Sequence, residues 1–299
     1  QGSQKVGMGK DLADNFKVAK EVFEEANDAL GFDLASLCFN GPDEDLKLTT
    51  NTQPAILTTS IAALKVVEQE TDLKPSFTAG HSLGEYSALV CSGSMQFADA
   101  VRTVRQRGAF MQEAVPVGIG AMAAIIGLDA DALDSVCCDA AEGEVVSAAN
   151  FNSPGQVVIA GHTSAVDRAI VLAKERGAKR ALPLPVSAPF HCSLMVPAGE
   201  RLADVLGDIM LNPMSIPVVS NVEALPNSDH ERIKDLLIAQ VSAPVKWDAS
   251  IEKMVADGVE RFIEIGAGKV LSGLVKRINK SASAANVEDS ASLDKLLNS

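Results

Sequence analysis

The fold class is decided by residues 76–91, which read Ser-Phe-Thr-Ala-Gly-His-Ser-Leu-Gly-Glu-Tyr-Ser-Ala-Leu-Val-Cys. A short extended run leads into a Gly-x-Ser-x-Gly turn at Gly80–Gly84, and a helical run begins near Leu83. Strand, sharp turn and helix in this order are typical of a nucleophile elbow in an α/β sheet. The two glycines leave no Cβ to clash on either side of Ser82. We therefore expect an α/β protein with Ser82 exposed at the turn.

Residues 118–188 show a different pattern of apolar and polar residues. Here the pattern predicts strand, helix, strand, strand, helix and strand over Ala121–Leu128, Asp129–Ala141, Val145–Ala149, Gln156–Ala160, Ser164–Gly177 and Arg180–Val186. The turn signal Asn-Phe-Asn-Ser-Pro-Gly at 150–155 joins the two central strands. This βαββαβ order is a ferredoxin-like unit. Continuation of one large sheet is the alternative, but the two halves match in length and order, which favours a separate small domain.

The flanking segments form the second domain of this interpretation. Helical spacing at 12–30 and 53–68 precedes the elbow, and Ile216–Ser220 and Arg261–Ile265 resemble buried parallel strands. We expect a large α/β domain with a parallel sheet over 1–117 and 189–299, into which the small domain 118–188 is inserted. The Ser- and Ala-rich tail, 280–299, is weakly specified.

Composition excludes several classes of protein. The chain has 299 residues, 47% of them apolar, a formal charge of −13 and a pI near 4.8. A general nucleic-acid binder needs a basic excess, so we expect no nucleic-acid partner. No stretch reads as a membrane span or a signal peptide. The chain opens on Gln1 without an initiator Met, so we expect the protein to start upstream.

The cysteines and histidines point to a reduced compartment and to no metal. Five cysteines, an odd number without Cys-x-x-Cys spacing, fit reduced thiols in the cytoplasm. With only four histidines, the chain offers no paired ligand spacing for zinc.

Ser82 needs a base, and elimination favours His191. His81 adjoins the nucleophile, where we expect its side chain to point away. His162 precedes a helix, and His230 sits in a polar loop. His191 lies in apolar surroundings just past the small domain, where two domains would form a cleft. A lone histidine in apolar surroundings is more often a packed, non-catalytic residue than a catalyst. No acid is placed to orient His191, so a backbone carbonyl or an amide is expected to hold it, giving a Ser–His dyad.

Two further groups complete the candidate site. The N–H of Leu83, at the start of the helix, is placed to stabilise an oxyanion. Arg107 lies at the margin of the apolar face of the helical stretch 97–114. It is either a snorkelling surface residue, the commoner case, or a buried clamp for a substrate carboxylate.

With these residues in place, the chain resembles the malonyl-CoA:acyl carrier protein transacylases nearly end to end. The resemblance rests on Gln1–Gln4, Thr52–Ala55, Gly80–Tyr86, Arg107–Gly108 with Phe110–Gln112, Asn150–Gln156, Phe190–Cys192 and Gly268–Leu271. It implies an α/β-hydrolase-like large domain with a ferredoxin-like small one. It also implies ping-pong transfer of a malonyl group from coenzyme A to acyl carrier protein in fatty acid biosynthesis, with no cofactor beyond the thioester substrate.

The resemblance also assigns roles to individual residues. Ser82 would be the nucleophile, His191 the base and Arg107 the ligand of the malonyl carboxylate. The N–H groups of Leu83 and Gln1 would form the oxyanion hole. The main-chain carbonyl of Gln240 would orient His191.

Coenzyme A and acyl carrier proteins are anionic, so a local basic patch must act against the net negative charge. We expect Lys179, Arg180, Lys276 and Arg277 to flank the mouth of the cleft, although each pair also fits an ordinary solvated helix end.

Three rival functions share parts of this pattern. A serine thioesterase or hydrolase shares the nucleophile and the base but uses water as the acceptor. A non-catalytic module that binds carrier proteins would not need Ser82, His191 and Arg107 together. An acyltransferase domain of a polyketide or fatty acid megasynthase is the third, and the absence of obvious linker arms favours a free-standing protein.

Overall fold

The computed structural model describes residues 2–186 and 188–299. The α-helices are α1 (Lys10–Asn15), α2 (Lys17–Leu30), α3 (Leu34–Asn40), α4 (Asp43–Lys47), α5 (Thr49–Glu70), α6 (Gly84–Cys91), α7 (Phe97–Glu113), α8 (Ala130–Ala141), α9 (Thr163–Glu175), α10 (Val196–Gly207), α11 (Ile233–Ser242), α12 (Trp247–Ala256), α13 (Val270–Ile278) and α14 (Ser290–Leu297). The strands are β1 (Thr78–Ala79), β2 (Gly120–Ile126), β3 (Val146–Ser153), β4 (Gln156–His162), β5 (Arg180–Pro183), β6 (Val218–Val219), β7 (Pro226–Asn227), β8 (Val245–Lys246), β9 (Arg261–Ile265) and β10 (Ser283–Val287). The fold is therefore mixed α/β, as expected.

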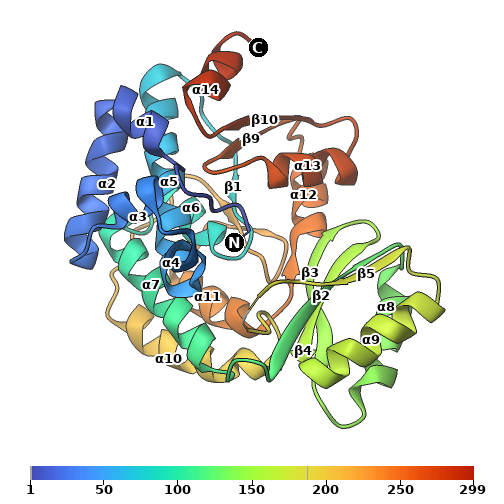
Figure 1. Ribbon diagram of the computed structural model, residues 1–299. Helices are drawn as coiled ribbons and strands as arrows, with labels where there is room; N and C mark the ends of the chain where they lie inside the picture. The colour runs from blue at the N-terminus through green and yellow to red at the C-terminus, as the bar shows by residue number, and fades with distance from the viewer. Residues whose placement is uncertain (1, 187) are drawn as a thin grey trace.

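A helical layer forms one side of the molecule (Figure 1). Helix α5 lies at its centre, packed between α2 and α7, and buries most of its length. Helix α7 comes close to α5 at Gly108, where an added Cβ would lie 2.6 Å from the Thr49 carbonyl oxygen. The single helix suggested by residues 12–30 is two helices, because Phe16 is extended (φ −127°, ψ 120°).

Two small sheets carry parallel strand pairs in this part of the chain. In the first, β1 pairs with β6 in parallel and β6 pairs with β7 in antiparallel. In the second, β9 and β10 are parallel. Both stretches expected as parallel strands therefore pair in parallel, but only β6 is fully buried, whereas β9 is half-buried or exposed. The tail of the chain is ordered as β10 and α14.

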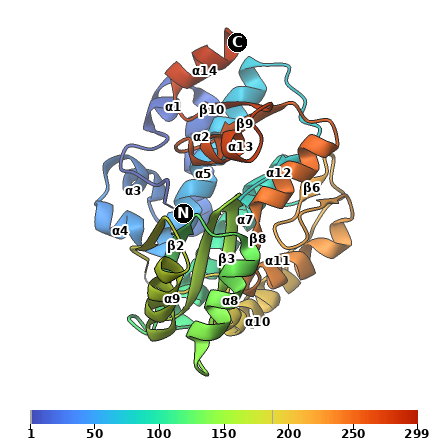
Figure 2. The ribbon, with the colours of Figure 1, turned by 90° about the vertical axis from the view of Figure 1, so that its right-hand side faces the viewer.

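Residues 120–183 contribute the first four strands of the largest sheet in the described part of the chain, whose strand order is β5-β2-β4-β3-β8. Its first four strands pair in antiparallel, and helices α8 and α9 cover one face (Figure 2). A separate apolar core lies between them, containing Ile125, Leu133, Ile159 and Val166. Strands β3 and β4 are longer than the sequence suggests, so the turn between them shortens to residues 154–155.

The sheet does not end at the boundary of this segment. Strand β8, which comes from the C-terminal part of the chain, pairs with β3 in parallel through Asn150↔Val245 and Phe151↔Lys246. This pairing fixes β3 against the segment that carries α11 and α12. The tip of β3 lies close to the Gly-x-Ser-x-Gly turn, because Asn152 Oδ1 is 2.9 Å from His81 Nε2.

Candidate active site

Ser82 lies at the sharp turn between β1 and α6, in the left-handed region of backbone space at φ 52°. Gly80 makes the turn possible, because a Cβ there would lie 2.0 Å from the backbone of Gly84. Gly84 itself has open space around its Cα. Asn221 holds the turn from the other side. Its Oδ1 accepts from the Ser82 N–H at 2.6 Å, and its Nδ2 donates to the Gly80 carbonyl at 2.7 Å.

His191 reaches the nucleophile from the far half of the chain. Its Nε2 lies 2.7 Å from Ser82 Oγ, and its Nδ1 lies 2.8 Å from the Gln240 carbonyl oxygen. The ring is 3% exposed. Burial, and then the positive charge of Arg107, lowers the pKa of His191 to about 3. The imidazole is therefore neutral near pH 7, with Nδ1–H donated to the carbonyl and Nε2 free to accept the serine proton.

Arg107 is buried rather than snorkelling, with 2% of its surface exposed. Its Nη2 donates to Ser82 Oγ at 3.1 Å and to Gln240 Oε1 at 2.9 Å. Its Nη1 donates to Gln53 Oε1 at 2.7 Å. Burial lowers the pKa of the guanidinium. Among the residues that the structure describes, none accepts a hydrogen bond from the buried Nε–H. The guanidinium can thus present donors to an anionic group beside the nucleophile.

Three residues of this network received no role from the sequence. Glu85 lies in the first turn of α6, and its Oε2 accepts from the Asn221 N–H at 3.0 Å and from Gln240 Nε2 at 2.7 Å. Gln53 and Asn221 are the other two, each at most 2% exposed. Gln53 belongs to a stretch that carried the resemblance, and Glu85 follows the Gly-x-Ser-x-Gly motif directly. No local sequence signal marks Asn221.

The other histidines are held elsewhere. The His81 ring bonds Asn152 Oδ1 of β3 at 2.9 Å and lies 5.7 Å from the Trp247 ring, between ring centroids. Burial lowers the pKa of His81 to about 4. His162 accepts from the Val145 N–H at 2.9 Å, and His230 is half-buried at the start of a 3-10 turn. Of the four, only His191 contacts Ser82 Oγ.

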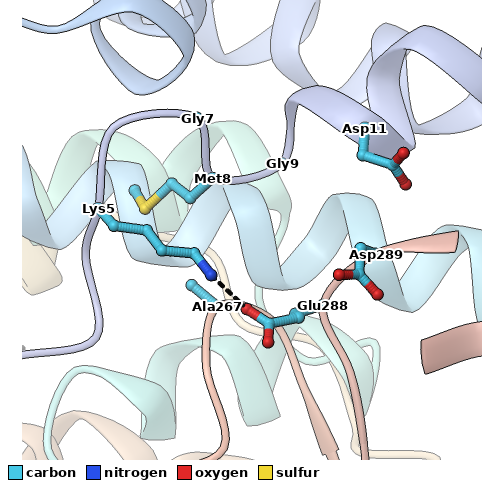
Figure 3. Close-up of a pocket in the computed structure, with 8 residues that line it drawn as sticks. All are labelled: Lys5, Gly7, Met8, Gly9, Asp11, Ala267, Glu288 and Asp289. Atoms are coloured by element: carbon cyan, nitrogen blue, oxygen red, sulfur yellow. Dashed lines mark hydrogen bonds and ion pairs between the residues drawn. The ribbon is translucent and has the colours of Figure 1, made fainter. Parts of the chain in front are cut away.

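The two candidate oxyanion donors lie at the start of α6 and at the N-terminus. Leu83 is the residue before α6, where N–H groups lack a helical acceptor one turn earlier. Gln1 lies outside the described residues. The segment that follows it is anchored by an ion pair between Lys5 Nζ and Glu288 Oε2 at 2.8 Å, beside a cavity of about 120 Å³ (Figure 3).

The four basic residues of the expected patch are exposed, and they gather at one end of the large sheet. In the sheet, Arg180 pairs with Ile126, and Ile126 pairs with Gln156. The Oε1 of Gln156 accepts a hydrogen bond from Arg277 Nη1 at 2.7 Å. Lys179 packs on Gly127, and Lys276 precedes Arg277 on α13. Gln156 also pairs with Ser153 of β3. Since the preceding Asn152 bonds His81, this end of the sheet is the one next to Ser82.

No metal or membrane feature accompanies the site. Over residues 2–186 and 188–299, no group of three or more His, Cys, Asp and Glu side chains is arranged to hold a metal ion. In the same ranges, every helix is too short or too polar to cross a bilayer.

Comparison with known proteins finds acyltransferases that are similar to this chain over nearly its whole length. Residues 1–296 match the model of the acyl transferase domain family. The malonyl CoA-acyl carrier protein transacylase of Escherichia coli K12 is 53% identical over 293 residues, which cover 98% of this chain and 95% of the relative.

Solved structures agree. An acyl carrier protein S-malonyltransferase from Vibrio cholerae superposes with a TM-score of 0.97 at 54% identity, covering 99% of this chain and 97% of its own. A malonyl-transacylase solved in complex with a type II PKS acyl-carrier protein superposes equally well at 50% identity, covering 100% and 96% of the two chains.

Proposed function

The chain belongs to the acyl transferase domain family, among the malonyl CoA-acyl carrier protein transacylases, and on that premise we propose its reaction. It moves a malonyl group from coenzyme A to the phosphopantetheine thiol of an acyl carrier protein, through a malonyl ester on Ser82, in fatty acid biosynthesis. The observation that carries this proposal is one hydroxyl, Ser82 Oγ, held 2.7 Å from His191 Nε2 and 3.1 Å from Arg107 Nη2.

Acylation is the first half of the cycle. His191 Nε2 takes the Ser82 proton as Oγ attacks the thioester carbonyl, and Gln240 holds the imidazolium through Nδ1. The tetrahedral oxyanion would be held by the N–H groups of Leu83 and Gln1, each contributing about 3–4 kcal/mol by analogy with other oxyanion holes. Collapse breaks the C–S bond, and His191 returns the proton to the leaving thiolate of coenzyme A.

Deacylation repeats these steps with a new nucleophile. The carrier thiol gives its proton to His191 Nε2 and attacks the malonyl-serine ester. The new thioester forms as the C–Oγ bond breaks, and His191 reprotonates Ser82. Coenzyme A and the carrier thus occupy the same position in turn, which gives ping-pong kinetics without any cofactor beyond the thioester itself.

Arg107 would select the acyl group. A malonyl carboxylate satisfies a buried guanidinium with charge-assisted hydrogen bonds, whereas an acetyl group leaves that charge without its partner. The unpaired Nε–H of Arg107 supports this role.

We also propose a two-domain division. A large α/β-hydrolase-like domain spans 1–117 and 189–299, and a ferredoxin-like domain spans 118–188. The support for the second is the strand order β5-β2-β4-β3 with two helices on one face, which is the order of a βαββαβ unit.

The basic patch of Lys179, Arg180, Lys276 and Arg277 would receive the anionic partners. The support for this role is the position of the patch at one end of the large sheet. At that end Gln156 pairs with Ser153, and the neighbouring Asn152 bonds His81, the residue before the nucleophile. A positive patch at that place would guide acidic carrier protein despite the net charge of −13. We place the protein in the cytoplasm, because all five cysteines are free thiols.

A decisive test is the mass of the intact protein after mixing with malonyl-CoA. Wild type should gain one malonyl group, and a Ser82→Ala control should gain none. Adding holo-acyl carrier protein should then discharge the adduct onto the carrier. Discharge at the same rate by water alone would indicate the hydrolase, and an absent adduct would indicate a non-catalytic binding module.

A further inference from the structure

One buried acid has no place in the mechanism above. Glu85 is 3% exposed, three residues after the nucleophile. A buried carboxyl without partners is costly, but Glu85 Oε2 accepts from the Asn221 N–H and from Gln240 Nε2. Burial raises the pKa of Glu85 to about 7, although these two hydrogen bonds and the positive charge of Arg107 act in the opposite direction. Glu85 thus joins the two residues that hold the Ser82 turn.

The Gln240 side chain has one possible orientation in this network. Its Nε2 donates to Glu85 Oε2 at 2.7 Å and to the Ser82 carbonyl at 3.0 Å, while its Oε1 accepts from Arg107 Nη2 at 2.9 Å. A flipped amide would bring donor against donor at Arg107 and acceptor against acceptor at Glu85. Since Gln240 is 0% exposed, water cannot relieve either contact.

The Gln240 amide also lies between the Glu85 carboxylate and the Arg107 guanidinium and bonds to both. The two hydrogen-bonded side chains that hold Arg107 on either side, Gln53 and Gln240, are both neutral. A carboxylate in direct contact would take the place that the substrate carboxylate needs. Glu85 therefore acts on Arg107 through an uncharged acceptor.

From this geometry we propose that Glu85 is a positioning residue for acyl-group selection. Its carboxylate fixes the Gln240 amide so that Oε1 holds Arg107 beside Ser82. The proposal rests on the proposed malonyl transfer. Glu85 touches no substrate, but it also supports the Ser82 turn through Asn221. Its removal should therefore slow every acyl group slightly, and slow the groups that use Arg107 much more.

The experiment compares Ser82 acylation by malonyl-CoA and by acetyl-CoA, followed by intact mass. In Glu85→Met, similar in length but without acceptors, malonyl acylation should fall about 10- to 100-fold and acetyl acylation less than about threefold, the loss expected when a buried charged donor is misplaced. Glu85→Gln retains an acceptor oxygen and should keep the wild-type ratio within about threefold.

Glu264→Met is a matched control. The Glu264 carboxylate also accepts two N–H groups, from Leu271 and Ser272, but at the start of α13. It should leave the malonyl-to-acetyl ratio unchanged. Gln240→Met should lower the ratio as Glu85→Met does, and the double variant should lower it no further, because both act on one contact.

The outcomes separate the two proposals. Wild type without a malonyl adduct overturns the proposed function. A malonylated wild type with parallel losses for both acyl groups in folded Glu85→Met overturns the role of Glu85 alone, as does additivity with Gln240→Met. Should Glu85→Met not fold, Glu85→Asp withdraws the carboxylate by one methylene. A lowered ratio there supports the proposal, and an unchanged ratio contradicts it.

Discussion

Replacing Arg107 with alanine should convert a malonyl-selective site into one that no longer distinguishes malonyl from acetyl. The guanidinium is 2% exposed and lies 3.1 Å from Ser82 Oγ, so a carboxylate bound there is shielded from water. Hydrogen bonds to charged groups contribute about 1.5–3 kcal/mol each, so a bidentate pair contributes about 3–6 kcal/mol. At about 1.4 kcal/mol per factor of ten, malonyl acylation should fall roughly 10²- to 10⁴-fold.

Acetyl acylation should respond differently to the same change. In wild type, an acetyl group leaves the buried charge of Arg107 without its partner, and the alanine removes that charge. Acetyl acylation should therefore hold or rise while malonyl acylation falls. Rates of adduct formation on Ser82, measured by intact mass at several concentrations of each thioester, give the two values of kcat/KM.

Two companion variants make the test specific. Arg105→Ala removes a guanidinium from the same helix, one that stacks on Phe32 at 4.1 Å, and should leave selectivity unchanged. Arg107→Lys keeps a charge but loses the planar fork, so we expect an intermediate ratio. If folded Arg107→Ala retained the wild-type malonyl-to-acetyl ratio, the assignment of Arg107 as the carboxylate ligand would be refuted.

Three other measurements test separate parts of the structure. Gly80→Ala should destabilise the protein by several kcal/mol or prevent folding, because its Cβ would lie 2.0 Å from backbone atoms of Gly84. Gly84→Ala is the control, since a Cβ at Gly84 has no atom within 4 Å, and denaturant unfolding compares the stability of the two variants. Because the pKa of His191 is lowered to about 3, the neutral base persists on acidification, and the rate of Ser82 acetylation by acetyl-CoA, which depends little on the Arg107 contact that Glu85 supports, should not fall through pH 6.5. A decline of that rate centred near pH 6.5 would contradict this. Lys276→Glu with Arg277→Glu should raise the KM for carrier protein in a salt-dependent way, and an unchanged KM would contradict the role of the patch.

The sequence alone determined the features that depend on neighbouring residues. The strand–turn–helix at Ser82 follows from glycine placement, since Gly80 must carry no Cβ where the chain reverses onto Gly84. The alternation of apolar segments in 118–188 predicted each strand and helix of that segment, because strand and helix periods are local properties. His191 was predicted as the base by elimination, because the chain has only four histidines to consider.

Tertiary structure decided the contacts between residues that are far apart in the sequence. The periodicity of α7 placed Arg107 at the edge of an apolar face, and its burial results from the close approach of α5 at Gly108. The tail became β10 because β9 supplies a parallel partner, which low intrinsic strand preference in a Ser- and Ala-rich stretch cannot reveal. The contacts of Glu85, Asn221 and Gln240 join segments more than a hundred residues apart. Such contacts leave no local period in the sequence, because folding alone brings their donors and acceptors within hydrogen-bond distance.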